Sequence, residues 1–316
     1  MKKILIIGAV GQIGSELTLK MRELYGNQNV IASTRKTEPS QKIKESGPFE
    51  FFDVMDRKKL EAVCDKYKVD HIVNMAAILS AVGEKDPMFA WDVNMNGLIN
   101  ILETAREKKI KQILMPSSIA VFGPGTPRVN TPQDTVLKPT TMYGVTKVAG
   151  ELLCDYYVRK YGVDIRGLRY PGIISHETLP GGGTTDYAVA IYYEAIQHGK
   201  YTCFVRESTK LPMMYMPDCL KATIDLFEAD FSKLKHHSDF NVAGMSFTVG
   251  EMATEIRKHM PDFKIDYQPD FRQAIADSWP ESIDDTAARE EWGWKPAYTL
   301  ASMTVDMLTE LKKKLK

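Results

Sequence analysis

A tyrosine and a lysine lie four positions apart in the segment "YGVTK", at Tyr143 and Lys147. The surrounding pattern predicts a helix, and residues i and i+4 of a helix lie on the same face. A tyrosine hydroxyl, with a pKa of about 10, is a poor base at neutral pH, but a neighbouring ammonium group stabilises its phenolate form. The pair therefore has the composition of a general base that removes a proton from an alcohol.

Two serines stand upstream of this pair in the segment "PSSIAVFG", where a predicted strand ends. The hydroxyl of Ser117 or Ser118 can hydrogen-bond the same reacting oxygen, whether that oxygen belongs to an alcohol or to a carbonyl. A tyrosine and a lysine at this spacing often occur by chance. The upstream serines strengthen the interpretation of this pair as catalytic. Either serine can complete a catalytic set with Tyr143 and Lys147.

The N-terminal segment "GAVGQIG" places Gly8, Gly11 and Gly14 directly after a predicted strand, "ILII", and at the start of a predicted helix. In that setting the early glycines allow a tight turn and close approach of the backbone to a pyrophosphate, and the last glycine lets helix and strand pack. The helix N-terminus adds amides and partial positive charge. Although the spacing is GxxGxxG rather than GxGxxG, its position predicts a dinucleotide site, with Gln12 and Ile13 beside the glycines.

The segment "STRK", residues 33–36, stands where such a site usually carries an acidic residue for the adenine ribose. The hydroxyls of Ser33 and Thr34 can bind the ribose of NAD instead. Alternatively, Arg35 and Lys36 can pair with the 2′-phosphate of NADP. A third explanation is a basic surface turn that contacts no ligand, and the residues alone leave all three open.

Further cofactor contacts are predicted at the ends of the next two strands. Asp53 and Val54 close the strand "FEFFDV", near the expected position of the adenine. Met75, Ala76 and Ala77 follow "HIVN", and the small alanines permit close approach of a cofactor. Because ligands of open parallel sheets bind at the carboxyl ends of the strands, we favour these contacts over ordinary strand termination.

A second glycine run, "LPGGGTTDYA" at residues 179–188, is predicted to bind substrate rather than phosphate, because it follows a polar loop instead of a strand. Its glycines let backbone amides approach a ligand, and a helix that starts near Thr185 offers donors to a carboxylate, while Asp186 can face an ammonium group. The alternative is a lid hinge in which Thr185 or Asp186 only caps the helix. The candidate substrate contacts are Ser80, Gly182, Thr184, Thr185 and Asp186, with Trp279 in the wall of the site.

Short apolar runs alternate with helical patterns through the first half of the chain, which predicts an α/β fold with a doubly wound parallel sheet of the Rossmann type. Long helices are expected over about 88–108 and 140–161. We expect residues 1–170 to form the dinucleotide-binding domain, joined by a returning segment at about 211–235. Residues 171–316 then form a smaller, interleaved substrate-binding lobe that closes over the carboxyl edge of the sheet.

The composition indicates a soluble globular protein with a small ligand. Of the 316 residues 44% are hydrophobic, and 41 lysines and arginines balance 41 aspartates and glutamates. Without net charge the chain lacks the field that attracts nucleic acid or an anionic membrane, and no stretch approaches the roughly 20 apolar residues of a membrane span. The scattered cysteines and histidines lack metal-ligand spacing, so we expect reduced thiols, a cytoplasmic location and no metal site.

The order of the motifs resembles that of the extended short-chain dehydrogenase/reductase family. GxxGxxG, "NMAA", "DVNMNGLINILE", "SSIAVFG", YxxxK and "RYPG" follow one another and cover about the first 170 residues. The resemblance implies that a serine, the tyrosine and the lysine are catalytic, that Lys147 also binds the nicotinamide ribose, and that Tyr170 lies at the cofactor. By its distance from Gly123, Ser118 matches the catalytic serine best, with Ser117 as its near alternative.

Longer blocks are more specific than these family-wide motifs. "PGGGTTDYA", "KLPMMYMPD", "DFRQAIADSWPESIDD" and "REEWGW" are similar to the short-chain L-threonine 3-dehydrogenases, over essentially the whole chain. That resemblance implies NAD-dependent oxidation of L-threonine at its β-hydroxyl to 2-amino-3-oxobutanoate, and a homodimer that pairs the two long helices. The threonine dehydrogenases carry an aspartate after "AS" where this chain has "STRK", so NAD is expected and NADP stays an alternative.

Two other functions fit part of the pattern. Nucleotide-sugar epimerases and dehydratases share the fold, but dehydratases carry an acidic pair after the catalytic serine or threonine, where this chain has Ile119 and Ala120. Some family members that have lost the tyrosine or the lysine act as nucleotide-sensing regulators. This chain keeps both residues, which favours an enzyme over a sensor.

Overall fold

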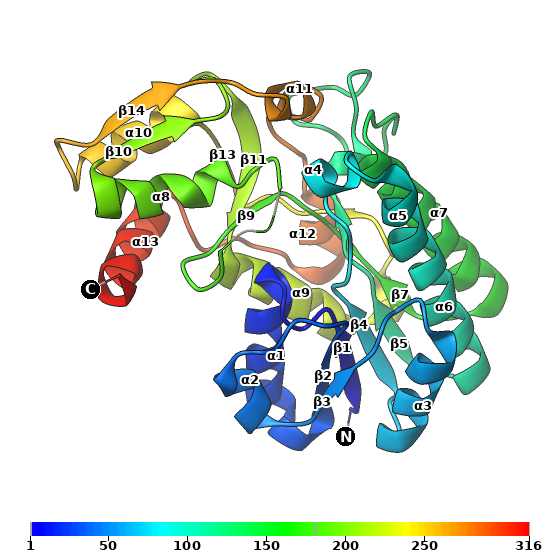
Figure 1. The fold of residues 1–316 in the computed structure, drawn as a ribbon. Coiled ribbons are helices and arrows are strands. Elements are labelled where there is room, and N and C mark those ends of the chain that lie inside the picture. Colours follow the sequence, from blue (N-terminus) through cyan, green and yellow to red (C-terminus); the bar gives the residue numbers. More distant parts are fainter. Residues whose placement is uncertain (1, 180, 182, 316) are drawn as a thin grey trace.

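The central sheet has six parallel strands in the order β3-β2-β1-β4-β5-β7, in a computed structural model that describes residues 2–179, 181 and 183–315 (Figure 1). The strands are β1 (Ile4–Ile7), β2 (Val30–Thr34), β3 (Phe49–Phe51), β4 (His71–Asn74), β5 (Gln112–Leu114) and β7 (Ile165–Arg166). The strand order reverses beside β1, and ligands of doubly wound sheets bind at such a switch point. The predicted α/β fold with a doubly wound sheet of the Rossmann type is confirmed.

Helices cover both faces of this sheet. Those of the first half are α1 (Gln12–Tyr25), α2 (Gln41–Ser46), α3 (Arg57–Tyr67), α4 (Ser80–Gly83), α5 (Pro87–Trp91), α6 (Gly97–Lys108) and α7 (Met142–Tyr161). The helix predicted over 88–108 is interrupted, because a π-helical turn at Asp92–Asn96 joins α5 to α6. The helix predicted over 140–161 begins at Met142, where the side chain of Thr141 caps its first turn.

The core is built by the alternation of side chains along strands that are covered on both faces. Ile4 and Ile6 of β1 belong to an apolar cluster with Leu17 of α1, whereas Leu5 and Ile7 belong to a separate cluster with residues of α3, α6 and α7. Successive side chains of a strand point to opposite faces of the sheet. Both sets are therefore buried, and the strand is a continuous apolar run in the sequence.

The C-terminal part of the chain forms a second lobe with small sheets of its own. Three strands pair in the order β13-β11-β9, and two more form a parallel pair: β9 (Gly172–Ile174), β11 (Lys210–Tyr215), β13 (Met245–Thr248), β10 (Lys200–Cys203) and β14 (Lys264–Tyr267). Its helices are α8 (Tyr187–His198), α10 (Val249–Arg257), α11 (Arg272–Asp277), α12 (Thr286–Trp292) and α13 (Leu300–Lys314). A further sheet, β12-β8-β6, joins segments from both halves of the chain: β6 (Ser117–Ser118), β8 (Leu168–Tyr170) and β12 (Phe240–Asn241).

The segment predicted to return to the first domain, 211–235, divides between the two lobes. Its start lies in β11, whereas α9 (Met216–Glu228) packs beside α1 against the central sheet (Figure 1). The amide nitrogen Nε2 of Gln112 in β5 donates to the carbonyl of Phe227 at the end of α9, at 2.9 Å. In the described part of the chain, no helix is both long enough and apolar enough to cross a membrane.

Candidate active site

A cavity of about 250 Å³ lies between the two lobes, where β1, β4 and β6 end. It brings together predicted residues of the first glycine run, the ends of β4 and β6, helix α7 and the second glycine run. Those that line it are Gly11, Gln12, Ile13, Gly14, Met75, Ala76, Ala77, Ser80, Ser117, Ser118, Tyr143, Lys147, Tyr170, Thr184, Thr185, Asp186 and Trp279. The predicted contact Gly182 lies outside the described residues.

The three N-terminal glycines each meet a different steric demand. Gly8 has a φ of +83°, and a Cβ there would lie 2.7 Å from the amide nitrogen of Ala76. A Cβ on Gly14 would lie 2.2 Å from the carbonyl oxygen of Gly8, so only glycine lets α1 pack this closely on β1. A Cβ on Gly11 would meet nothing nearer than 3.6 Å, so this backbone faces open space in the cavity.

The start of α1 suits a pyrophosphate. Gly11 occupies its N-cap position, and no side chain accepts a hydrogen bond from the first amides. Free amides and the positive end of the helix dipole bind anions at such a position. The glycine turn, the open side of Gly11 and the uncapped helix therefore fit a dinucleotide cofactor.

The predicted residues at the end of β2 and after β3 do not line the cavity, although the carbonyl of Ser33 accepts a bond from the amide of Gly8 in the glycine turn. The hydroxyl of Ser33 is buried and donates to the carbonyl of Ile6 at 3.0 Å. The guanidinium of Arg35 lies 3.8 Å from a carboxylate oxygen of Asp53 and 5.6 Å from the ring centre of Phe89. Arg35 is therefore already in contact with an acidic and an aromatic side chain of its own protein.

Two other predicted cofactor contacts, Val54 and Thr34, have side chains that pack inside the protein. Val54 is buried, and a Cβ on Gly97 of α6 would lie 2.8 Å from one of its methyl carbons. The carbonyl of Val54 accepts a bond from Nδ2 of Asn100 at 3.0 Å. The side chain of Thr34 is also buried. By contrast, the side chains of Arg35 and Asp53 are 49% and 37% exposed, and Lys36 is exposed as well.

Tyr143, Lys147 and Ser118 converge at the inner end of the cavity. Tyr143 and Lys147 lie one turn apart on α7, and the ammonium of Lys147 is 5.5 Å from the centre of the tyrosine ring. Burial raises the pKa of Tyr143 to about 12, opposed by its hydrogen bond with Ser118. Burial lowers the pKa of Lys147 to about 8, opposed by the charge of Glu151. Below pH 8 the cavity therefore holds an ammonium next to a neutral phenol.

The two candidate serines have different partners. The side chain of Ser118 is hydrogen-bonded to Tyr143, and its oxygen also accepts a bond from the amide of Ala120 at 3.2 Å. The hydroxyl of Ser117 donates instead to the carboxylate of Glu151 on α7. This arrangement favours Ser118 as the serine that contacts a reacting oxygen.

The second glycine run lies on the other side of the cavity. The hydroxyl oxygens of Thr184 and Ser80 are 3.2 Å apart, and both side chains are buried. The helix predicted to start near residue 185 begins at Tyr187, so Asp186 takes the N-cap position of α8. The carboxylate of Asp186 accepts a bond from the amide of Gly183 at 2.9 Å, which holds the turn in shape.

Sequence reasoning missed several residues that line the same cavity. They are Asn74, Leu79, Pro116, Ile119, Pro171, Gly172, Ile173 and Gly183. Most lie within a few positions of a predicted contact. The rule that ligands meet the carboxyl ends of parallel strands applied to Asn74 at the end of β4, and it could have found this residue.

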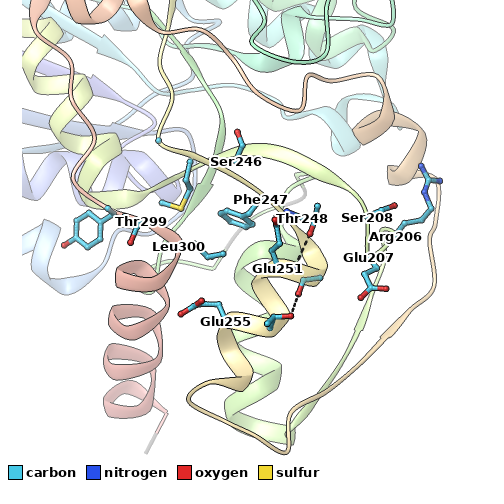
Figure 2. A pocket seen from close by; sticks show the side chains of 15 residues that line it. Arg206, Glu207, Ser208, Ser246, Phe247, Thr248, Glu251, Glu255, Thr299 and Leu300 are labelled. Carbon is cyan, nitrogen blue, oxygen red and sulfur yellow. Dashed lines mark hydrogen bonds between the residues drawn. The ribbon is translucent and has the colours of Figure 1, made fainter.

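A larger surface groove, of about 1120 Å³, lies in the second lobe between β13, α10 and the start of α13 (Figure 2). No described residue lines both this groove and the cavity at the sheet edge. Two of its polar residues form the capping box of α10: the amide of Glu251 donates to the Thr248 hydroxyl at 3.0 Å, and the Glu251 carboxylate accepts from the Thr248 amide at 2.6 Å. Size alone therefore does not identify the site of chemistry.

The chain belongs to the NAD dependent epimerase/dehydratase family, whose sequence profile matches residues 4–243. It is an enzyme of the nicotinamide-dependent oxidoreductase type. It is 52% identical to an uncharacterized epimerase/dehydratase of Staphylococcus saprophyticus, over 100% of this chain and 99% of the relative. The solved L-threonine dehydrogenase of Clostridium difficile is 55% identical, with a TM-score of 0.97 over 99% of this chain and 98% of that one. A monomeric L-threonine 3-dehydrogenase from a metagenome is 48% identical, with a TM-score of 0.95 over 99% and 100% of the two chains.

Proposed function

We propose that the protein oxidises L-threonine at its β-hydroxyl to 2-amino-3-oxobutanoate, with NAD as the hydride acceptor. The observation that carries the proposal is the convergence of Ser118, Tyr143 and Lys147 in a cavity that also contains the Thr184–Thr185 segment. Similarity to L-threonine dehydrogenases over essentially the whole length of the chain supports the choice of substrate.

The residues of the chain supply proton transfer and orientation. The substrate hydroxyl lies between Ser118 and Tyr143, and Ser118 holds its oxygen by a hydrogen bond. Tyr143, as phenolate, takes the hydroxyl proton while the carbonyl bond forms. Gly8, Gly11 and the start of α1 would hold NAD, which when bound would supply the acceptor for the hydride of the β-carbon. The ammonium of Lys147 lowers the free energy of the phenolate, and the fixed positions of the two reactants supply much of the rate.

The carboxylate of threonine is proposed to bind at the Thr184–Thr185 segment, where the start of α8 adds the positive end of a helix dipole. Thr185→Ala is then expected to raise the KM for L-threonine about tenfold and to change the KM for the cofactor much less. The basis is that a hydrogen bond to a charged group contributes roughly 1.5 to 3 kcal/mol. Steady-state kinetics with each substrate varied in turn measure both constants.

Thr254→Ala, which changes an exposed threonine on α10, is the matched control for this substitution. It is expected to leave both KM values at the wild-type level. If Thr185→Ala raises the KM for the cofactor more than the KM for threonine, the second glycine run serves the nucleotide instead.

NAD is proposed over NADP because the guanidinium of Arg35 already faces the carboxylate of Asp53. A 2′-phosphate bound to Arg35 would stand near this second negative charge, and like charges repel. The purified protein is expected to reduce NAD with L-threonine, with little or no rate on serine or UDP-sugars, and to prefer NAD to NADP. Absorbance at the reduced-nicotinamide band, with each substrate tried on each cofactor, measures this directly. Reduction only with NADP would reverse the role given to Arg35.

A homodimer is proposed through the outer faces of α6 and α7. On α7 the side chains of Val145, Leu152 and Tyr156 are 41%, 65% and 50% exposed, at spacings of seven and four residues that form one stripe. Ile99 of α6 adds a further exposed apolar side chain, at 41%. A second copy of the chain can cover this stripe by pairing the same helices, as the resemblance to the extended family implies.

Leu152→Glu is expected to convert the dimer to a monomer, because a buried unpaired carboxylate is costly at an apolar interface. Light scattering after size-exclusion chromatography measures the mass. Val305→Glu on α13, at a similarly exposed apolar position in the other lobe, is the control and should leave the dimer intact. A wild-type protein that elutes as a monomer at all concentrations contradicts the proposed interface.

A further inference from the structure

We propose that Glu151 is a positioning residue for the catalytic set: through Ser117 it fixes the strand that carries Ser118, and its negative charge balances the ammonium of Lys147. This inference rests on the alcohol oxidation proposed above. Glu151 does not line the 250 Å³ cavity among the described residues, so it acts through its neighbours rather than on the substrate.

The geometry of α7 carries the first part of the inference. Tyr143, Lys147 and Glu151 are spaced by four residues, so they occupy three successive turns of one helix face. The ammonium of Lys147 donates to the carbonyl of Pro116 at 2.7 Å, and the next residue, Ser117, donates its hydroxyl to Glu151. Two adjacent residues of the segment that leads to Ser118 are thus bound to the helix that carries the base.

The pleat of β6 explains why this attachment matters for Ser118. Neighbouring side chains of a strand point to opposite faces. When the side chain of Ser117 is held toward Glu151, the side chain of Ser118 must therefore point the other way, toward Tyr143. β6 is only two residues long and pairs with β8, where Ser117 is opposite Arg169. So short a strand has few ladder bonds of its own, and the bond from Ser117 adds a further constraint on the direction of Ser118.

The second part of the inference concerns charge. The carboxylate of Glu151 is buried, and Arg169 donates one N–H bond to each of its oxygens, both at 2.9 Å. Burial raises the pKa of Glu151, while the charge and the hydrogen bonds of Arg169 oppose that rise. A carboxylate oxygen of Asp239 lies 3.4 Å from Nη2 of Arg169, one of the two nitrogens that donate to Glu151. Two cations, Lys147 and Arg169, are therefore matched by two carboxylates.

Little solvent separates these groups. The space that Lys147, Glu151, Asn94 and Ser117 enclose together is about 10 Å³, close to the minimum for one water molecule. Cys154, one turn beyond Gly150, also lines this space, but burial raises the pKa of its thiol, so it adds no charge at neutral pH. Without bulk water between them, the charge of Glu151 acts on Lys147 with weak screening.

The consequence for ionisation has a definite sign. Removal of a negative charge disfavours the ammonium of Lys147 and favours the phenolate of Tyr143, so the pKa of each group falls. Because the two groups are coupled, the observed values belong to the pair, and both shift in the same direction. Loss of a purely structural contact would lower activity at every pH and leave these values in place.

Two variants separate the two roles. Glu151→Gln keeps the size of the side chain but removes its charge, and both limbs of the pH profile of kcat/KM should move to lower pH by at least about half a unit. Ser117→Ala breaks the attachment of β6 and keeps the charge, so kcat should fall about tenfold with both limbs unmoved. Glu103→Gln, which removes the partner of Arg106 on α6, is the matched control and should change neither kcat nor the profile.

A second measurement does not depend on turnover. The absorbance of tyrosine phenolate is followed as the pH is raised, with oxidised cofactor bound. The same titration is run on a protein that also carries Tyr143→Phe, and the difference between the two curves reports the ionisation of Tyr143. Its midpoint should lie at lower pH in Glu151→Gln than in the wild-type background. If the wild-type protein fails to oxidise L-threonine, the proposed function is wrong, and this titration still tests Glu151.

Several results overturn the inference. The charge of Glu151 has no role in ionisation if the folded Glu151→Gln protein keeps both limbs of the pH profile, and the midpoint of Tyr143, at the wild-type pH. A Ser117→Ala enzyme with wild-type kcat excludes the attachment role, and it decides this point even if Glu151→Gln does not fold. A shift of the midpoint to higher pH contradicts the sign derived from the geometry.

Discussion

Tyr143→Phe is expected to lower kcat for L-threonine at least about 100-fold, because phenylalanine lacks the oxygen that accepts the substrate proton. The loss should be selective for chemistry. The tyrosine is buried, and its hydroxyl is hydrogen-bonded to Ser118, which stands at the same cavity. The phenyl ring keeps its packing in the core of the second lobe, so the unfolding temperature should change little. Steady-state rates and thermal denaturation measured on the same sample test both statements.

A matched control is available on the same helix. Tyr156 lies between three and four turns further along α7 and is 50% exposed, so Tyr156→Phe removes a hydroxyl of the same kind away from the cavity. This variant should keep the wild-type kcat. Near-normal turnover of Tyr143→Phe would refute the assignment of the base, whereas equal losses in both variants would point to a general effect on α7.

The sheet could be predicted from the sequence because its strands are covered on both faces. Ile4–Ile7 and His71–Asn74 are buried at every position, and such strands appear as short apolar runs between helical patterns. The π-helical turn at Asp92–Asn96 could not be predicted in this way. Apolar spacing reports which face of a helix is buried, and a single wider turn leaves that face almost unchanged.

The cavity was predictable where the chemistry depends on local spacing. Tyr143 and Lys147 are four residues apart on one helix, so their proximity follows from helix geometry alone. The choice between Ser117 and Ser118 depends instead on the pairing of β6 with β8 and on the carboxylate of Glu151. These contacts join residues distant in the sequence, and no local pattern contains them.

The adenosine end of the site shows the same limit. The sequence left three possibilities for residues 33–36, because all four side chains are polar. They could bind the ribose of NAD, bind the 2′-phosphate of NADP, or contact no ligand. In the structure the hydroxyl of Ser33 is bonded inside the protein, and Arg35 lies against Asp53, which follows β3, and Phe89 of α5. The contacts with Asp53 and Phe89 therefore bear on whether Arg35 can bind a phosphate. Neither contact could be predicted from the sequence.

Lys147→Met is expected to lower kcat/KM for L-threonine at least about 100-fold at neutral pH. Methionine fills a similar volume without the ammonium, so the phenolate of Tyr143 loses its stabilising charge and the pKa of Tyr143 rises. A rise of about two pKa units leaves about one hundredth of the phenolate at a given pH. The acid limb of the profile should therefore move to higher pH, and part of the lost rate should return in alkaline buffer.

A second variant and the pH profile separate loss of the charge of Lys147 from a general structural defect. Burial lowers the pKa of Lys147 to about 8, which means that its environment disfavours the charged form. Methionine relieves this burial cost, but it also removes the donor to the carbonyl of Pro116 and the cation beside Glu151, so the unfolding temperature should fall at neutral pH. Lys147→Arg keeps a cation and should keep the acid limb near its wild-type pH even if kcat falls through misplacement. An unmoved acid limb in Lys147→Met would show that the ammonium does not control the base, and the role of Lys147 would then be limited to binding.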